Sequence, residues 1–407
     1  MRRAAALLPL LALSCVQPAR WTAADDPTPD LARILLETDQ PERLIVLSGP
    51  SEVPEIPMRE RLRPCCAFGS DLRISAGFFP IPAVRLPNVI GPEDLGPHTY
   101  DSGLVHRRRE GDREFGIGRE HNGLIYTCRA GFIDTAHVRD YLDWAAFFSV
   151  RIGKALLSAS PVQIELPDEG GARRVRVQMP PQVVARDPVL AARAAGQWVA
   201  FQLSIWHELA TWYGWESVAG FPEEASAFSP EDLYSNLLGV KLAGALLHRR
   251  SLRSEPLFNQ GATEWFAQSL VALQATPRDV GVDAMDALDG VWWDSRARVP
   301  EKTLVLRRNF GIGDPIEPWR VPDAIAPESL RKACGDAELL PLASPDALAG
   351  IPFASWLTFE IDADAEILAQ PSFPQLGRAV TQADFPALVS AARAQNREEA
   401  GADADHP

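Results

Sequence analysis

The stretch DTAHVRDYLDWAAFFSVRIGKALL, residues 134–157, predicts a long helix around which the rest of the chain can be arranged. Apolar side chains recur in it every three or four residues, so one face of the helix is expected to be buried. That apolar stripe holds Tyr141, Trp144, Phe148 and Ile152. At its N-terminal end the stripe runs into Asp134 and His137, which project side by side because they are three residues apart.

A second predicted helix repeats the combination of a carboxylate and an imidazole. Asp187 and Pro188 are a typical N-cap and first helical residue, and the helix is expected to run to about Tyr213. Its apolar seam holds Trp198, Phe201, Ile205 and Trp212. Glu208 interrupts this seam, and His207 lies on the adjoining face. A buried carboxylate must be neutralised, hydrogen-bonded or bound to a metal, because an unpaired buried charge costs several kcal/mol.

The other elements are shorter and are separated by many of the 35 prolines. Further helices are expected at 31–38, 230–250 (after Ser229), 262–275, 283–293 and 383–397. Strands are expected at 43–49, 123–128, 303–308 and 356–362, and a two-stranded ribbon at 161–167 and 173–179. We therefore predict a predominantly helical, single-domain α+β fold with small β-ribbons and irregular, Pro-rich connections.

The N-terminus predicts export. Two arginines precede a short apolar run that ends at Ser14 and Cys15, as in the lipobox of a bacterial lipoprotein. Cys15 would then carry the lipid that anchors the protein to a membrane, and cleavage by ordinary signal peptidase is the alternative. Val16 gives no inner-membrane retention signal, so we expect a periplasmic protein anchored to the outer membrane. The net charge of −14 argues against nucleic acid as a partner.

These features predict a simple domain organisation. Residues 1–15 are the signal peptide and residues 16–30 a polar, Pro-rich tether. Residues 31–398 form one globular envelope domain with its core at 60–300, and residues 399–407 are a disordered tail.

Two helices that each bring an acid and a histidine inward can form a metal site. His137 and His207 would be zinc ligands, with Asp134 or Asp232 as the third, and Glu208 would be the base that takes a proton from water. The structural alternative is that these pairs only satisfy one another, with Asp134 and Asp232 as helix caps. The zinc-protease signature is incomplete, because Thr211 stands where a second histidine would be.

A thiol site is the other chemical alternative. Cys128 follows a predicted strand, and His137 or His98 could serve as its base. The structural alternative is a buried or disulfide-bonded Cys128, because the residue precedes the helix N-terminus that would activate a thiolate. Adjacent Cys65 and Cys66 are poorly placed to bond each other, and at most one of them is expected to bridge to Cys128 or Cys334.

Four blocks carry a family resemblance: RPCCAFG, GLIYTCRAGFIDTAHVRDYLDW, IWHELATWYGW and AFSPEDLYSNLLGVKLAG. In this order they resemble the bacterial lipoprotein family called domain of unknown function 4056, over roughly residues 60–300. The resemblance implies an exported, lipid-anchored envelope protein of a Gram-negative bacterium. It assigns no catalytic residue and does not choose between metal and thiol.

Three functional hypotheses remain, in order of preference. The first is a metal-dependent hydrolase that acts on a peptide, lipid or glycan ester or amide of the cell envelope. The second is a non-catalytic envelope lipoprotein with a structural His/Glu/Asp cluster and a partner- or lipid-binding cleft. That cleft would be lined by Trp206, Trp212, Trp215, Trp292 and Trp293, although such residues are more often core. The third is a thiol hydrolase or acyltransferase that uses Cys128.

Overall fold

The structure is a computed structural model. It describes residues 27–38, 55–61, 63, 67–76, 79–103, 120–217, 222–247, 254–344, 346–401 and 404–407. Its helices are α1 (Pro29–Thr38), α2 (Thr135–Leu157), α3 (Gln182–Ala185), α4 (Pro188–Trp212), α5 (Asp232–Leu247), α6 (Glu255–Ala272), α7 (Arg278–Asp286), α8 (Glu328–Cys334), α9 (Ala365–Leu368) and α10 (Phe385–Ala400). Its strands are β1 (Leu72–Ala76), β2 (Phe79–Leu86), β3 (Leu124–Thr127), β4 (Gly131–Asp134), β5 (Val162–Leu166), β6 (Gly171–Val177), β7 (Ala347–Leu348), β8 (Ile351–Pro352), β9 (Leu357–Ala363) and β10 (Ala379–Thr381). The prediction of a predominantly helical α+β single domain is confirmed.

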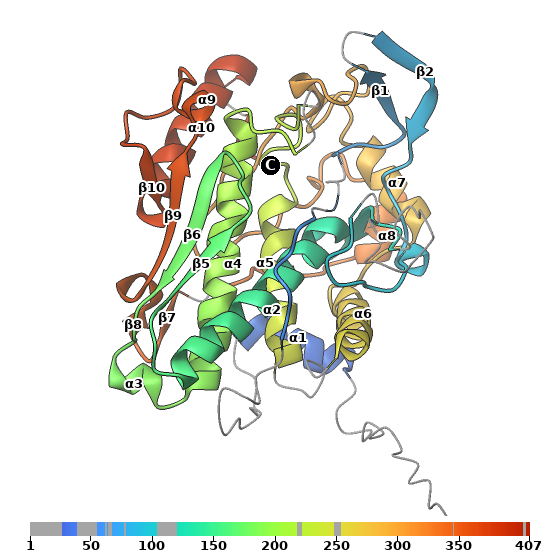
Figure 1. The fold of residues 1–407 in the computed structure, drawn as a ribbon. Helices are drawn as coiled ribbons and strands as arrows, with labels where there is room; N and C mark the ends of the chain where they lie inside the picture. The colour runs from blue at the N-terminus through green and yellow to red at the C-terminus, as the bar shows by residue number, and fades with distance from the viewer. Residues whose placement is uncertain are drawn as a thin grey trace, which may run out of the picture.

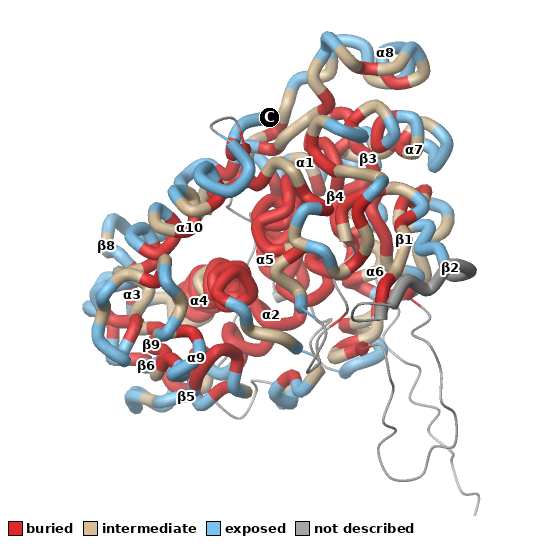
Figure 2. Tube along the Cα trace, turned by 90° about the horizontal axis from the view of Figure 1, so that it is seen from above, coloured by how far each residue is buried: buried red, intermediate tan, exposed pale blue. Residues whose placement is uncertain are grey.

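Helices α2, α4 and α5 form the centre of the molecule, and the other elements surround them (Figure 1). Figure 2 shows these three helices as the most completely buried part of the chain. Two glycines allow α4 and α5 to approach α2 closely. A Cβ at Gly239 of α5 would lie 2.0 Å from the carbonyl oxygen of Val138, and one at Gly196 of α4 would lie 2.1 Å from Oγ of Ser149. Both Val138 and Ser149 belong to α2, so α2 is held tightly on two sides.

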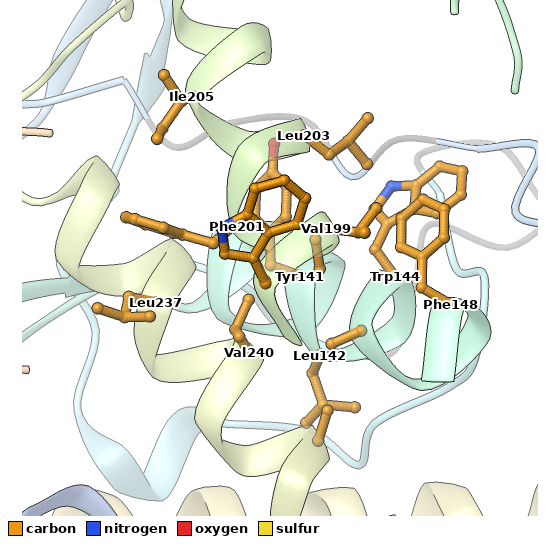
Figure 3. Packing of buried hydrophobic residues seen from close by; sticks show 14 of the residues in the cluster. Tyr141, Leu142, Trp144, Phe148, Val199, Phe201, Leu203, Ile205, Leu237 and Val240 are labelled. Atoms are coloured by element: carbon orange, nitrogen blue, oxygen red, sulfur yellow. The ribbon is translucent and has the colours of Figure 1, made fainter. Parts of the chain in front are cut away.

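The apolar stripe predicted for the central helices is present but is only part of their burial. Tyr141, Trp144 and Phe148 of α2 pack with Phe201 of α4 and Leu237 of α5 (Figure 3). However, every residue of α2 from its start to Val150 is buried, including the charged ones. A helix buried all round must find partners for its polar side chains within the protein. The charged side chains of α2 find these partners in the two charged clusters described below.

The two strands of the predicted ribbon belong to a larger sheet. Strands β5 and β6 pair as expected, and β9 and β10 add to the free edge of β6 in the antiparallel order β10-β9-β6-β5. The sheet lies along α4, with α10 also packed on α4 (Figure 1). The joining of β6 to β9, some 180 residues apart, was not predicted, because no local pattern reports such a distant pairing.

Several smaller predictions are wrong. Residues 303–308 form no strand: Lys302–Leu304 is a single 3-10 turn. The predicted helix at 283–293 is the shorter α7, which begins at Arg278 and ends at Asp286.

The expected disorder of the tail 399–407 is wrong for its described residues. Helix α10 runs to Ala400, and the carbonyl of Ala404 accepts the backbone N–H of Arg308 at 2.8 Å. Asp405 pairs with Arg397 at 2.9 Å, and its exposed fraction is only 7%. The cationic side chains of α10 therefore fold the acidic end of the chain back onto the protein.

The thiol hypothesis is wrong. Cys128 at the end of β3 is bonded to Cys334 at the end of α8, so it has no thiolate to act as a nucleophile. The bond closes a loop of 206 residues and ties the β3–β4 hairpin to the C-terminal third of the chain. Cys65, Cys66, the predicted strand at 43–49, and the predicted signal peptide with Cys15 lie outside the described residues.

None of the described helices is both long enough and apolar enough to span a bilayer.

Candidate metal centre

Two imidazoles and a carboxylate come together at the centre of the fold. His137 lies in the first turn of α2, and His207 and Glu208 lie in the last two turns of α4. One ligand atom from each of the three lies within 4.8 Å of the other two. The ring centres of His137 and His207 are 6.1 Å apart. Two imidazoles that share a zinc ion, with metal–nitrogen bonds near 2.1 Å, have ring centres about 5 Å apart. A small side-chain movement would therefore complete the site.

A carboxylate is hydrogen-bonded to one ring nitrogen of His207 and orients the ring. Its Nδ1 forms a short hydrogen bond with Glu169, which also pairs with Arg173. The indole N–H of Trp206 donates to the backbone carbonyl of Glu169 at 2.8 Å and fixes that residue in turn. With Nδ1 engaged, His207 presents Nε2 to a ligand. A metal-binding histidine typically has such a carboxylate on its other nitrogen.

His137 has a similar arrangement. Its Nδ1 lies 3.4 Å from Oδ1 of Asp232. The other oxygen of Asp232 accepts the backbone N–H of Ser229 at 2.7 Å, in the turn that precedes α5. The predicted capping role of Asp232 is thus confirmed, and the same side chain also lies beside the imidazole. Each of the two histidines is therefore backed by one carboxylate.

Glu208 is oriented by two donors. Its Oε2 accepts the backbone N–H of Phe228 at 2.8 Å, and its Oε1 accepts Nδ2 of Asn236 at 3.4 Å. Glu208 is 2% exposed, and among the described residues it forms no ion pair with an arginine or a lysine. Buried Arg308 interacts electrostatically with Glu208, but its N–H groups donate to the carbonyls of Ala227, Ala225 and Lys302. Among the described residues, no arginine or lysine therefore pairs with Glu208 at contact distance.

Asp134, the predicted third ligand, acts as the N-cap of α2. One oxygen accepts the backbone N–H groups of Ala136 at 2.7 Å and of His137 at 3.2 Å. The capping alternative is confirmed, and Asp134 is not among the atoms that cluster within 4.8 Å in the described chain. Its role as a metal ligand stays a prediction. Through the cap, Asp134 fixes the turn that carries His137.

We use the term acidic cluster for Asp134, Glu208, Glu231 and Asp232, which are all buried. Burial and the neighbouring carboxylates of Asp134 and Glu208 raise the pKa of Glu231 well above its usual value. Burial and the carboxylates of Glu208, Glu231 and Asp134 do the same to the pKa of Asp232. Like charges crowded in a low-dielectric interior favour either protonation or a bound cation.

A second set of buried charges, which we call the arginine cluster, lies further along α2. It consists of Arg59, Arg63, Arg139, Glu120, Asp140 and Asp143, together with His98. Arg63 contacts Glu120 at 2.7 Å and Asp143 at 3.0 Å. His98, one of the bases considered for the thiol, has its Nε2 2.9 Å from Asp143.

In the arginine cluster, nearby positive charge lowers the pKa values of the carboxyl groups more than burial raises them. Burial alone would raise the pKa of Glu120, but Arg63 and Arg139 lower it well below its usual value. Burial would also raise the pKa of Asp143, but His98 and the guanidinium of Arg63 lower it. Three arginines thus meet three carboxylates.

The tryptophan-lined cleft is wrong for four of its five residues. Trp206, Trp212, Trp292 and Trp293 are at most 2% exposed and are packed in the core. Only Trp215 is half-buried, with its ring centre 5.9 Å from that of His207.

The sequence patterns predict no role in the site for two of its residues. Glu169 lies in the connection between the two predicted ribbon strands, and Glu231 lies at the start of the predicted helix 230–250. Glu231 could have been found from its position beside Asp232, whereas Glu169 reaches His207 through tertiary packing alone.

Comparisons with known proteins give a family but no activity. No curated protein and no solved structure matches this chain. The profile of a family described as "Protein of unknown function (DUF4056)" matches residues 53–322, which include the whole candidate metal centre. This range agrees with the resemblance noted for residues 60–300. Because the match covers well over half of the 407 residues, the chain belongs to the DUF4056 family.

Proposed function

We propose that this protein is a metal-dependent hydrolase in which His137, His207 and Glu208 bind a zinc-like ion. The observation that carries the proposal is the convergence of these three side chains within 4.8 Å, with each imidazole backed by its own carboxylate. A set of two histidines and one glutamate is typical of catalytic zinc sites that keep one position open for water. Zinc in such a site lowers the pKa of its bound water to about 7 and polarises a carbonyl group.

The protein side chains supply orientation in this proposal. The hydrogen bond to Glu169 holds His207 in the tautomer that presents Nε2, Asp232 lies 3.4 Å from Nδ1 of His137, and the N–H of Phe228 fixes Glu208. Half-buried Trp215 beside His207 indicates the side from which a substrate would arrive. The structure favours Glu208 as a ligand over the role of base, because its carboxylate lies in the same compact group as the ring nitrogens.

The substrate class follows from the expected export of the chain. With a lipid on Cys15, the centre would face the periplasm and act on a peptide, lipid or glycan ester or amide of the envelope. Radiolabelled fatty acid should be incorporated into the full-length protein and not into a Cys15→Ser variant. Equal labelling of both proteins would contradict a lipid anchor at Cys15 and would also remove the argument for an envelope substrate.

The test of the hydrolase uses cobalt as a spectroscopic substitute for zinc. The visible spectrum of the cobalt-loaded protein should change when azide is added, because azide replaces water at an open coordination position. The zinc-loaded protein should hydrolyse members of a panel of esters and amides, lose this activity on chelation and recover it with zinc. A cobalt spectrum that ignores azide, together with no hydrolysis, would contradict the proposal.

The second candidate is a structural metal centre in a non-catalytic lipoprotein. The observation that favours it is burial: His137 and Glu208 are 3% and 2% exposed. Glu208→Gln separates the possible roles of the carboxylate. If Glu208 is a ligand, the variant should lose metal affinity. If Glu208 is the base, the variant should keep the metal and lose only turnover.

A further inference from the structure

The carboxyl group of Glu231 is in an unusual position for a buried acid. The residue is 3% exposed, and neither of its carboxyl oxygens has a hydrogen-bond partner among the described residues. It also forms no ion pair there with an arginine or a lysine. A buried ionised group without a partner costs several kcal/mol, so such a side chain calls for a ligand.

The backbone around Glu231 shows where this carboxyl group lies. The carbonyl of Glu231 accepts the N–H of Ser235 at 2.9 Å, and Oγ of Ser235 accepts the backbone N–H of Asp134 at 2.9 Å. Ser235 therefore joins the start of α5 to the start of α2. The carboxylates that act most strongly on Glu231 are those of Asp134 and Glu208. Glu231 thus lies in an acidic electrostatic environment.

A second polar atom without a partner lies in the same region. Asn236 is completely buried; its Nδ2 donates to Glu208, and its Oδ1 accepts no hydrogen bond from the described residues. The reverse amide orientation would turn Oδ1 toward the Glu208 carboxylate, so the orientation shown is the favourable one. Glu231 and Asn236 therefore present three buried oxygen atoms that accept no hydrogen bond.

We infer that a second cation binds to Glu231 and Asp134 on the Glu208 side of the metal centre, with Oδ1 of Asn236 as a neutral donor. All of these donors are oxygens, which select hard cations such as Mn²⁺, Mg²⁺ or Ca²⁺. The imidazole pair, in contrast, suits zinc. Glu208 accepts Nδ2 of Asn236 and also groups with the two imidazoles, so the centre would hold two cations of different chemistry. Two-metal hydrolases use such a pair to stabilise the attacking and leaving oxygens.

This inference does not require the imidazole site to be catalytic, and it can be tested separately. Protein stripped with chelator is first loaded with zinc, and Mn²⁺ is then titrated while free Mn²⁺ is followed by electron paramagnetic resonance. The zinc-loaded wild type should bind one equivalent of Mn²⁺. Glu231→Gln should still bind one equivalent of zinc and should weaken Mn²⁺ binding at least about tenfold, the effect of losing about 1.4 kcal/mol.

Two further variants complete the design. His207→Gln should lose zinc but retain a Mn²⁺ site. Glu360→Gln, a buried glutamate paired with Arg174 and Arg176 on the sheet, is the matched control and should bind both metals as the wild type does. Circular dichroism reports whether each variant is folded, and Asp134→Asn provides an independent substitution at the same site.

The outcomes separate the two proposals. Zinc binding that depends on His207, with Mn²⁺ binding unchanged by Glu231→Gln and Asp134→Asn, would overturn the second site and leave the first. Binding of Mn²⁺ that depends on Glu231 without any zinc binding would support the second site and overturn the proposed function. Binding of neither metal would overturn both.

Discussion

The arginine cluster and the acidic cluster are two solutions to the burial of charge beside the same helix, α2. In the arginine cluster, Arg59, Arg63 and Arg139 meet Glu120, Asp140 and Asp143, and the pKa values of Glu120 and Asp143 are lowered. In the acidic cluster, the pKa values of Glu231 and Asp232 are raised, and neither Glu208 nor Glu231 has a cationic partner among the described residues.

The difference distinguishes structure from function without knowledge of the substrate. A buried network whose charges cancel can be explained by stability and register alone. A buried network with excess negative charge and two adjacent imidazoles must take up protons or bind a cation, because neither Glu208 nor Glu231 has an arginine or lysine partner among the described residues. The comparison therefore predicts opposite responses of the two clusters to substitution, metal and pH.

The largest effect is expected from removing a cation of the arginine cluster. Arg63→Met would leave Glu120 without its main partner and Asp143 without one of its partners, and should lower the free energy of unfolding by about 3–5 kcal/mol. Chemical denaturation at neutral pH measures this. Arg85→Met is the control, since the Arg85 pair with Asp71 is exposed and should change stability by less than about 0.5 kcal/mol. Equal losses in both variants would contradict the structural role of the cluster.

Metal addition should stabilise the protein through His137, His207 and Glu208 and not through the arginine cluster. At a free zinc concentration 100 times Kd, the wild type should gain about 2.7 kcal/mol relative to chelated protein. The gain should disappear in His207→Gln. It should persist in His121→Asn, which replaces an exposed histidine at a left-handed backbone position that asparagine tolerates. Thermal unfolding with and without chelator measures both, and a gain retained in His207→Gln would place the metal elsewhere.

Changes of pH should act on the two clusters with opposite sign. Carboxyl groups with lowered pKa, such as Glu120 and Asp143, stabilise the fold above their unfolded pKa of about 4 and lose this contribution as the pH falls through their folded pKa. Groups with raised pKa, such as Glu231 and Asp232, contribute fully below the unfolded value, and the contribution is lost as the pH rises through the folded value.

Two measurements follow from these signs. Chelated protein should lose stability toward acid, and the stabilisation by zinc should grow between pH 5 and pH 8, because the metal displaces protons. Melting temperatures recorded with and without zinc test both statements, from about pH 2 to pH 4 for the loss toward acid and from about pH 5 to pH 8 for the effect of zinc. Stabilisation by zinc that does not change with pH would mean that no buried acid or imidazole releases protons on binding.

The smallest effects are expected from replacing a buried glutamate by glutamine, once in the acidic cluster and once at a glutamate that is paired with arginines. In metal-free protein at pH 8, Glu231→Gln should increase stability by about 1 kcal/mol because it removes a carboxyl group whose ionisation the acidic cluster disfavours. Glu360→Gln should decrease stability, because Glu360 is paired with Arg174 and Arg176. Urea denaturation of both variants with chelator present gives the two signs. A loss of stability in Glu231→Gln would show that its carboxylate has a partner.

Local patterns predicted the helices that carry the site, whereas tertiary contacts decided its composition. The spacing of Tyr141, Trp144 and Phe148 predicted α2, and Asp187 with Pro188 predicted the start of α4. Helical periodicity could also place His137 and Glu208 on inward faces. It could not show that Glu169, on a turn between β5 and β6, reaches His207. Nor could it pair Cys128 with Cys334 across 206 residues.

The central claim is that the acidic cluster and its two imidazoles hold a metal ion. Elemental analysis of full-length protein, purified without chelator from cells grown in trace-metal medium, tests it most directly. We predict at least one equivalent of a divalent metal such as zinc in the wild type, and none at the imidazole site in His137→Gln or His207→Gln. Metal-free wild-type protein that also fails to bind zinc when it is added would contradict the claim.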